Sequence, residues 1–305
     1  MRRYVLGRVF QAGLALLGVT CVAFLLVSLS GDPAFILLTP EAGDEQRAAF
    51  RQMYGLDQPL PVQYAQYIAH VVRGDFGRSF AFERPALTVV MERVPATLEL
   101  TCAALLLGIG FGIPAGVIAA AREGTWFDRG VMAVVLLGQS VPTFWLGLLM
   151  IRIFAVNLHW LPVSGRGTFA HLVLPAVSLG AALAATLARM TRATLLEELR
   201  EPYVLAARAR GVSRTRAVLG HAFRNSLIPV VTIVGLQFGA VLTGAVITET
   251  IFAWPGIGRL LIQSIGFRDY PLVQGCILLI ALTYVGVNLL TDVLYGVLDP
   301  RIRYE

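Results

Sequence analysis

The chain contains 305 residues, of which 56% are apolar and only 14% are charged, and its mean hydropathy is +0.71. Soluble globular domains carry roughly 25% charged residues, so this chain lacks the polar surface that a soluble protein of its length requires. The composition excludes a disordered chain, a disulfide-rich scaffold and a typical soluble enzyme, and it indicates a polytopic membrane protein.

All the basic residues are arginine, and they give the chain a formal net charge of +6. Because lysine is absent, a Gly-Lys-Ser/Thr phosphate loop cannot be present, and ATP is not bound in that way. The positive charge is better explained by arginine-rich cytoplasmic loops than by nucleic-acid binding. The three cysteines each lie in an apolar run and are interpreted as small hydrophobic residues.

Six stretches without charged residues follow one another along the chain. They cover residues 9–29, 100–121, 130–151, 172–188, 227–248 and 270–291. A helix of about 22 residues is about 33 Å long, which is enough to cross a hydrocarbon core of about 30 Å. Backbone polar groups in lipid must be satisfied internally, and the runs lack the alternation of a β-barrel. We therefore predict an all-α protein with six transmembrane helices.

Arginine is unevenly distributed between the short segments that join these runs. With a cytoplasmic N-terminus, the inner segments hold 15 arginines and the short outer loops hold 4. The positive-inside rule then places both ends of the chain in the cytoplasm. The expected organisation is a first span at 1–29, an external segment at 30–95, a core at 96–298 with a cytoplasmic loop at 189–225, and a tail at 299–305. A cleaved signal peptide is the competing interpretation of the first apolar run, but that run is longer than the usual 7–15 residues.

Two segments outside the spans have a recognisable pattern. Apolar residues from Tyr64 to Val72 recur at helical spacing, which predicts a small amphipathic helix on the outer face. Residues 252–266 are nearly apolar but are broken by Pro255, Gly256 and Gly258. They predict either a short re-entrant or interfacial helix beside a gate or an ordinary packed loop.

Five residues within or just after the apolar runs are candidates for the solute pathway or a gate. The candidates are Gln139, Ser140, Glu249, Trp254 and Asn288. Gln139 and Ser140 lie next to a kink expected at Pro142, and Glu249 either lines an outer gate or makes a structural hydrogen bond. The sequence offers no catalytic pair or triad and no spacing of metal ligands.

The cytoplasmic loop at 189–225 carries the most specific pattern. Pro202 suits the first turn of a helix, Gly211 suits the position after a helix end, and Ser213 suits an N-cap. We therefore expect two short helices joined by a turn, with the loop arginines facing water or lipid headgroups. The Ala-Ala-x-x-x-Gly pattern at 206–211 suits close contact with a partner's groove.

The residues from Pro202 to Pro229 resemble the EAA loop of ABC importer permeases. The Glu-Ala-Ala-x-x-x-Gly pattern falls on residues 205–211, with Leu205 in place of the glutamate, and the later Leu-Pro becomes Ile228-Pro229. Further matches lie at 2–8, 31–33, 56–59, 74–77, 254–258 and 298–301. Nearly the whole chain is thus similar to the first permease of the dipeptide, oligopeptide and nickel branch, which includes dipeptide and glutathione importers.

This resemblance implies a type I ABC importer permease fold in the bacterial inner membrane. It implies a second permease subunit, two ATPase subunits that bind ATP and Mg, a periplasmic or lipid-anchored substrate-binding protein, and no cofactor in this chain. The residues that would couple to the ATPase are Pro202, Tyr203, Val204, Ala206, Ala207, Arg208 and Gly211. The expected cargo is a short peptide. Nickel or another small solute, a secondary transporter acting alone, and an intramembrane enzyme are the alternatives.

Overall fold

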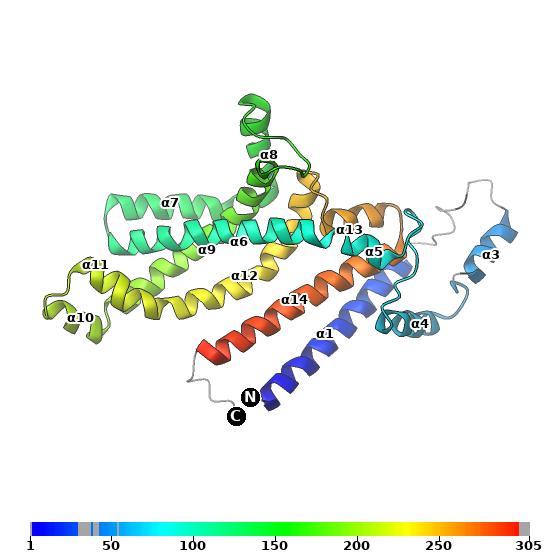
Figure 1. Ribbon diagram of the computed structural model, residues 1–305, viewed down its shortest axis with the longest axis horizontal. Coiled ribbons are helices and arrows are strands. Elements are labelled where there is room, and N and C mark those ends of the chain that lie inside the picture. The colour runs from blue at the N-terminus through cyan, green and yellow to red at the C-terminus, as the bar shows by residue number, and fades with distance from the viewer. Residues whose placement is uncertain (1, 30–37, 39–42, 54, 299–305) are drawn as a thin grey trace. The chain divides into compact units, whose positions relative to one another are not determined.

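The computed structural model describes residues 2–29, 38, 43–53 and 55–298 (Figure 1). The described residues form helices and no strand, apart from one isolated bridge between Arg78 and Pro85. The chain divides into two compact units. Unit 1 comprises Met1–Thr97 and Pro255–Val285, and unit 2 comprises Leu98–Trp254 and Gly286–Glu305. The predicted tail at 299–305 lies outside the described residues.

Long apolar helices confirm the predicted class. Among the described residues, five helical segments are long and apolar enough to span a membrane, and one bent helix pair makes a sixth if it counts as one span. The helices of the five segments are α1 (Arg2–Leu29), α5 (Ala86–Met91) with α6 (Val94–Ala121), α9 (Phe169–Leu199), α12 (Phe223–Ile251) and α14 (Tyr270–Leu298). The helix α9 extends eleven residues beyond the predicted run 172–188, so residues 189–199 are helical rather than loop.

The third predicted span differs from the expectation of one kinked helix at 130–151. It is two helical pieces, α7 (Trp126–Ser140) and α8 (Thr143–Met150) with its continuation η1 (Ile151–Asn157), which meet at 102°. Val141 between them is extended, with φ −83° and ψ 122°. The cause is Pro142, since a proline drives the residue before it out of the helical region and cannot donate a backbone hydrogen bond.

In unit 2, α9 packs closely against α6 through glycine. A Cβ added to Gly112 would lie 2.5 Å from the carbonyl oxygen of Ala184, and one added to Gly116 would lie 2.5 Å from that of Ala188. Gly180 on α9 approaches α6 in the same way. Small residues four apart let two helix backbones touch, and this contact replaces the hydrophobic effect as the source of stability within lipid.

Unit 1 has its own apolar core. The short helix α5 and the start of α14 pack with α13 (Ile257–Gly266) through Val89, Val90, Leu260 and Leu272. The predicted helix after the Pro-Gly break is therefore present as α13. The buried carboxylate of Asp269 joins this core to residues 79–81, because it accepts hydrogen bonds from Ser79 Oγ (2.6 Å) and Ala81 N (2.9 Å).

Between α1 and α5, the predicted amphipathic helix is present as α4 (Leu60–Val72), preceded by α3 (Asp44–Met53). Tyr64 anchors α4 to α1, because its hydroxyl lies 3.0 Å from Thr20 Oγ1 and its ring lies 5.4 Å from that of Phe24. Arg73 is the C-cap of α4, and Gly74 follows it with φ +76°, a conformation that favours glycine.

Candidate functional site

The segment that follows α9 forms the predicted pair of short helices. The first, α10 (Pro202–Ala209), begins with Pro202 at N1 and ends before Gly211, which has φ +92°. The Gly211 N–H bonds the carbonyl of Arg208 (3.0 Å), and the Val212 N–H bonds that of Ala207 (3.2 Å). These bonds supply donors to two of the carbonyls that have no hydrogen-bond partner within the helix at its C-terminal end. Ser213 directly precedes the second helix, α11 (Arg214–Arg216), which continues through η2 (Ala217–Ala222) into α12.

One side of α10 is buried against neighbouring helices, and the other side is exposed. Val204 is fully buried in a cluster with Leu195 of α9 and with Ala217 and Val218 of η2. Leu205, at the position of the family's glutamate, is 51% exposed. Ala206 and Arg208 are also exposed, and Ala207 is half-buried. Of the predicted coupling residues, Val204 therefore holds the helix in place, while its neighbours form the surface that a partner can reach.

The hydroxyl of Tyr203 ties α10 to the two long helices beside it. It donates to Glu198 Oε2 near the end of α9 (2.5 Å) and accepts from Asn225 Nδ2 near the start of α12 (2.9 Å). Partial burial, followed by the hydrogen bond to Glu198, raises the pKa of the Tyr203 phenol above its ordinary value. The hydroxyl therefore stays protonated at physiological pH and can serve both bonds. The sequence analysis identified Tyr203 but neither of its partners.

Two ion pairs, which the sequence analysis also missed, hold the turn between α6 and α7 against α9. Arg192 donates twice to the buried carboxylate of Asp128, at 2.6 and 2.7 Å, and the Gly124 N–H donates to the same carboxylate at 3.0 Å. Arg200 pairs with Glu123 at 3.0 Å. Arg200 directly precedes the segment that leads into α10, so the α6–α7 turn and α10 are attached to the same end of α9.

Gln139 and Ser140 lie at the break between α7 and α8, as predicted, but Gln139 is engaged on both sides. Its Oε1 accepts from Arg189 (2.8 Å) and its Nε2 donates to Thr186 Oγ1 (3.1 Å), both on α9. Ser140 is exposed and donates to the carbonyl of Leu136 (2.9 Å). Gln139 therefore fastens the broken span to α9, and its assignment to the pathway stays a prediction.

Glu249 and Trp254 lie together where α12 ends, and both side chains are buried. The Trp254 N–H donates to the Glu249 carbonyl (2.8 Å). Arg166 lies over the Trp254 ring at 5.9 Å and pairs with Glu99 at 2.6 Å. Because the Glu249 side chain is buried, the structure favours a structural hydrogen bond over a place in an outer gate, the two roles that the sequence allowed. Asn288 is half-buried on α14, and its pathway role stays a prediction.

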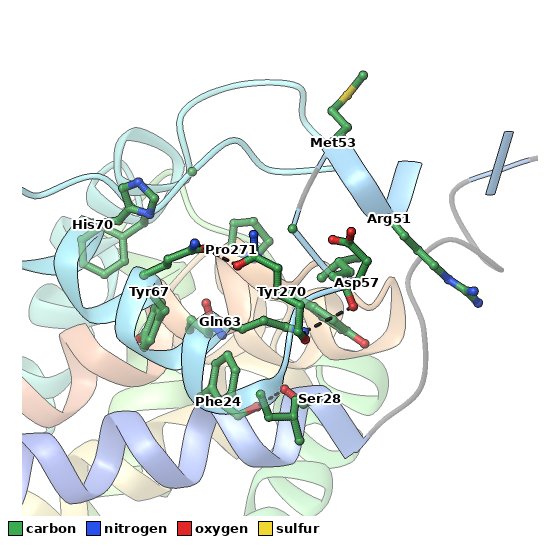
Figure 2. A pocket seen from close by; sticks show the side chains of 18 of the residues that line it. Phe24, Ser28, Arg51, Met53, Asp57, Gln63, Tyr67, His70, Tyr270 and Pro271 are labelled. Atoms are coloured by element: carbon green, nitrogen blue, oxygen red, sulfur yellow. Dashed lines mark hydrogen bonds between the residues drawn. The ribbon is translucent and has the colours of Figure 1, made fainter. Parts of the chain in front are cut away.

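Unit 1 contains a cleft of about 920 Å³ (Figure 2). Figure 2 shows Tyr67 and Gln63 of α4 and Phe24 of α1 lining the cleft, together with Tyr270 and Pro271 of α14. The Tyr67 hydroxyl is buried without a hydrogen-bond partner among the described residues, and burial, with a smaller effect of Tyr64, raises its pKa to about 12.

Two family models match the chain. The model described as binding-protein-dependent transport system inner membrane component covers residues 112–304, and the model of the N-terminal part of such membrane components covers residues 1–101. The glutathione transport system permease proteins GsiC of Escherichia coli (strain K12) and Salmonella typhimurium (strain LT2) are each 45% identical to the chain over 306 residues, which is 100% of both chains.

Solved structures give the fold. A chain of the MetNI methionine ABC transporter in an inward-facing conformation has a TM-score of 0.59 at 23% identity, covering 69% of this chain and 96% of its own length. A chain of an amino acid ABC transporter with histidines has a TM-score of 0.53 at 17% identity, covering 70% and 94%. The predicted importer-permease fold is thereby confirmed for the larger part of the chain.

Proposed function

The chain belongs to the inner-membrane permease family of binding-protein-dependent transport systems, in its peptide branch, and we propose that it forms half of the translocation path for a peptide of the glutathione type. It is a transport subunit of an ABC importer. Full-length similarity to glutathione permeases supports glutathione, or a short peptide of similar size, as the solute.

The proposed mechanism rests on the helix α10, which is buried on one side and exposed on the other. Val204 fixes one side of the helix in the core of unit 2, and Tyr203 bonds it to α9 and α12. A short helix held in this way moves as one body with the long helices, so a push on its open side tilts them. We assign the push to an ATPase subunit whose two copies close on ATP and Mg, while this chain binds neither.

The remaining partners follow from the same proposal. A second permease completes the path, and a periplasmic or lipid-anchored binding protein delivers the solute to the side opposite α10. The N- and C-termini then lie in the cytoplasm of a bacterial cell, on the side of the arginine-rich segments. Membrane lipid surrounds the long apolar helices.

Replacing Ala206 by arginine tests the role of α10. Ala206 is exposed, so the variant folds, but the added charged side chain prevents close docking. After mild detergent extraction, the wild-type chain should retain an ATPase subunit, recognised by its nucleotide-hydrolysis activity, and Ala206→Arg should retain at least tenfold less. Val72→Arg is the matched control, since Val72 is 81% exposed in the other unit. Equal retention by both variants would contradict the proposal.

A further inference from the structure

The cleft of about 920 Å³ in unit 1 plays no part in the proposed movement of α10. Sites for small ligands in proteins measure about 300–1,000 Å³, so the cleft has room for a ligand of the size of a short peptide. Its walls come from α1, from the α3–α4 region, from residues 75–80 and from the start of α14. All these segments belong to unit 1, so the cleft is complete within one unit.

Hydrogen bonds hold the walls of the cleft in place. Gln63 Nε2 of α4 donates to the carbonyl oxygens of Gln58 (2.7 Å) and Leu56 (3.3 Å), which fastens the α3–α4 turn to α4. Gln66 Nε2 donates to Gln58 Oε1 (2.9 Å) and adds a second attachment. The contact between Tyr64 and α1 holds α4 itself in place. Because these walls are already ordered, little conformational freedom is lost when a ligand binds between them.

Aromatic rings form the apolar part of the lining. Phe24 of α1 and Tyr67 of α4 lie side by side, with their ring centroids 6.0 Å apart and their planes stacked. Phe76, Phe80 and Tyr270 line other parts of the cleft. Such rings offer flat apolar surface, which favours contact with an apolar or aromatic side chain of a ligand.

The polar part of the lining offers an amide and a carboxylate. Gln274 of α14 is half-buried and Asp57 is exposed, and neither side chain makes a hydrogen bond or ion pair with another described residue. An amide donates and accepts hydrogen bonds as a peptide bond does, and a carboxylate accepts them from an ammonium group. In Figure 2, Tyr67 lies to the left of Gln63 and Asp57 to its right, so the aromatic and acidic parts of the lining are separated.

We propose that this cleft binds a short peptide with a free amino end. The Asp57 carboxylate receives the terminal ammonium group, the Gln274 amide bonds the main chain, and the rings of Phe24 and Tyr67 cover an apolar side chain. The inference rests on the proposed function, because it takes the solute to be a peptide that arrives at the C-terminal end of α1, where Ser28 lines the cleft. The permease then holds the solute itself before the solute enters the path.

Two other classes of ligand share part of this chemistry. A saccharide stacks on aromatic rings and bonds amides, but it has no cation for Asp57. A simple amine suits Asp57 but leaves the rings of Phe24 and Tyr67 uncovered. A peptide is the ligand that uses the carboxylate, the amide and the aromatic rings together.

The test measures binding to the full chain in nanodiscs, without other subunits, by equilibrium dialysis. The probes are tritiated alanyl-phenylalanyl-alanine, its N-acetyl form and maltotriose. The variants are Asp57→Asn and Gln274→Leu, and Asp57→Glu keeps the carboxylate. Asp44→Asn is the matched control, because Asp44 is an exposed acid of α3 outside the cleft. ATP-driven uptake of the tripeptide by the complete transporter is measured in parallel.

The wild-type chain and Asp44→Asn should bind the tripeptide saturably, and Asp57→Asn and Gln274→Leu should bind it about tenfold more weakly. Acetylation of the probe should weaken its binding to the wild-type chain by a similar factor, and Asp57→Glu should bind more tightly than Asp57→Asn. Equal binding by all these variants, or equal binding of maltotriose and the tripeptide, overturns the proposal. Uptake without binding to the permease overturns this inference alone, whereas the expected binding pattern without uptake supports the cleft and overturns the proposed function.

Discussion

Replacing Asp128 by asparagine tests whether the α6–α7 turn is fastened to α9 by a buried ion pair. The Asp128 side chain is 4% exposed and that of Arg192 is 26% exposed, so the pair is largely shielded from solvent. The substitution keeps the shape of the side chain and removes its charge. Arg192 then loses two charge-assisted hydrogen bonds and keeps a partly buried positive charge without a counter-ion.

The magnitude follows from the geometry. Removing one partner of a fully buried ion pair costs roughly 3–5 kcal/mol, and a hydrogen bond to a charged group contributes about 1.5–3 kcal/mol. Because Arg192 reaches solvent with a quarter of its surface and asparagine can still accept one bond, we expect a loss of about 2–3 kcal/mol. Glu123→Gln is the control. Its partner Arg200 is 75% exposed, so this loss should stay below about 1 kcal/mol.

The assay is reversible unfolding of the purified chain in mixed micelles of a mild detergent and sodium dodecyl sulfate, followed by circular dichroism. A double-mutant cycle with Arg192→Gln isolates the energy of the pair itself. The reasoning is refuted if Asp128→Asn destabilises the chain no more than Glu123→Gln, or if the cycle gives no coupling.

Three further predictions use the same unfolding assay. Gly112→Ala places a methyl group against the Ala184 carbonyl and should lower the free energy of unfolding by about 1–3 kcal/mol. Gly110→Ala is the control and should be nearly neutral, because there is open space around Gly110. Similar losses of stability in both variants would contradict the close helix contact. Asp269→Ala removes the acceptor of the buried Ser79 hydroxyl and of the Ala81 N–H, so the free energy of unfolding should fall by about 2–3 kcal/mol and residues 79–81 should be cleaved faster by a protease. Unchanged proteolysis would contradict the role of Asp269 in holding this segment. Because burial raises the pKa of Tyr67 to about 12, the neutral phenol contributes stability that is complete below pH 10 and is lost as the pH rises to about 12. Tyr67→Phe should therefore lose less stability than the wild-type chain over this pH range. An identical pH profile in both proteins would show that burial of the phenol has no such effect.

Local signals in the sequence were sufficient for α10 and for most spans. Pro202 and Gly211 act through backbone geometry alone, so the helix between them could be placed without knowing its surroundings. Charge-free runs likewise identify membrane helices, because a backbone segment that crosses lipid must satisfy its own hydrogen bonds and a helix does so. At the third run, Pro142 indicates a bend from the sequence, but the angle of 102° depends on what packs around it and could not be predicted locally.

Contacts between distant residues could not be predicted in this way. Asp128 and Arg192 are 64 positions apart, and their pairing depends on how α7 lies along α9. The same holds for Tyr203, whose partner Asn225 follows a turn and a second helix. The sequence indicates Glu249 as an acid at the end of an apolar run, but only the packed structure shows that it is buried.

Solute uptake into proteoliposomes tests the central claim most directly. The chain is reconstituted with its second permease and ATPase subunits, its binding protein is added on the side opposite α10, and accumulation of labelled glutathione is followed. The account predicts uptake only when ATP is present on the side of α10, and at least a tenfold loss with Ala206→Arg. Uptake by this chain alone without ATP would contradict it and would identify a secondary transporter.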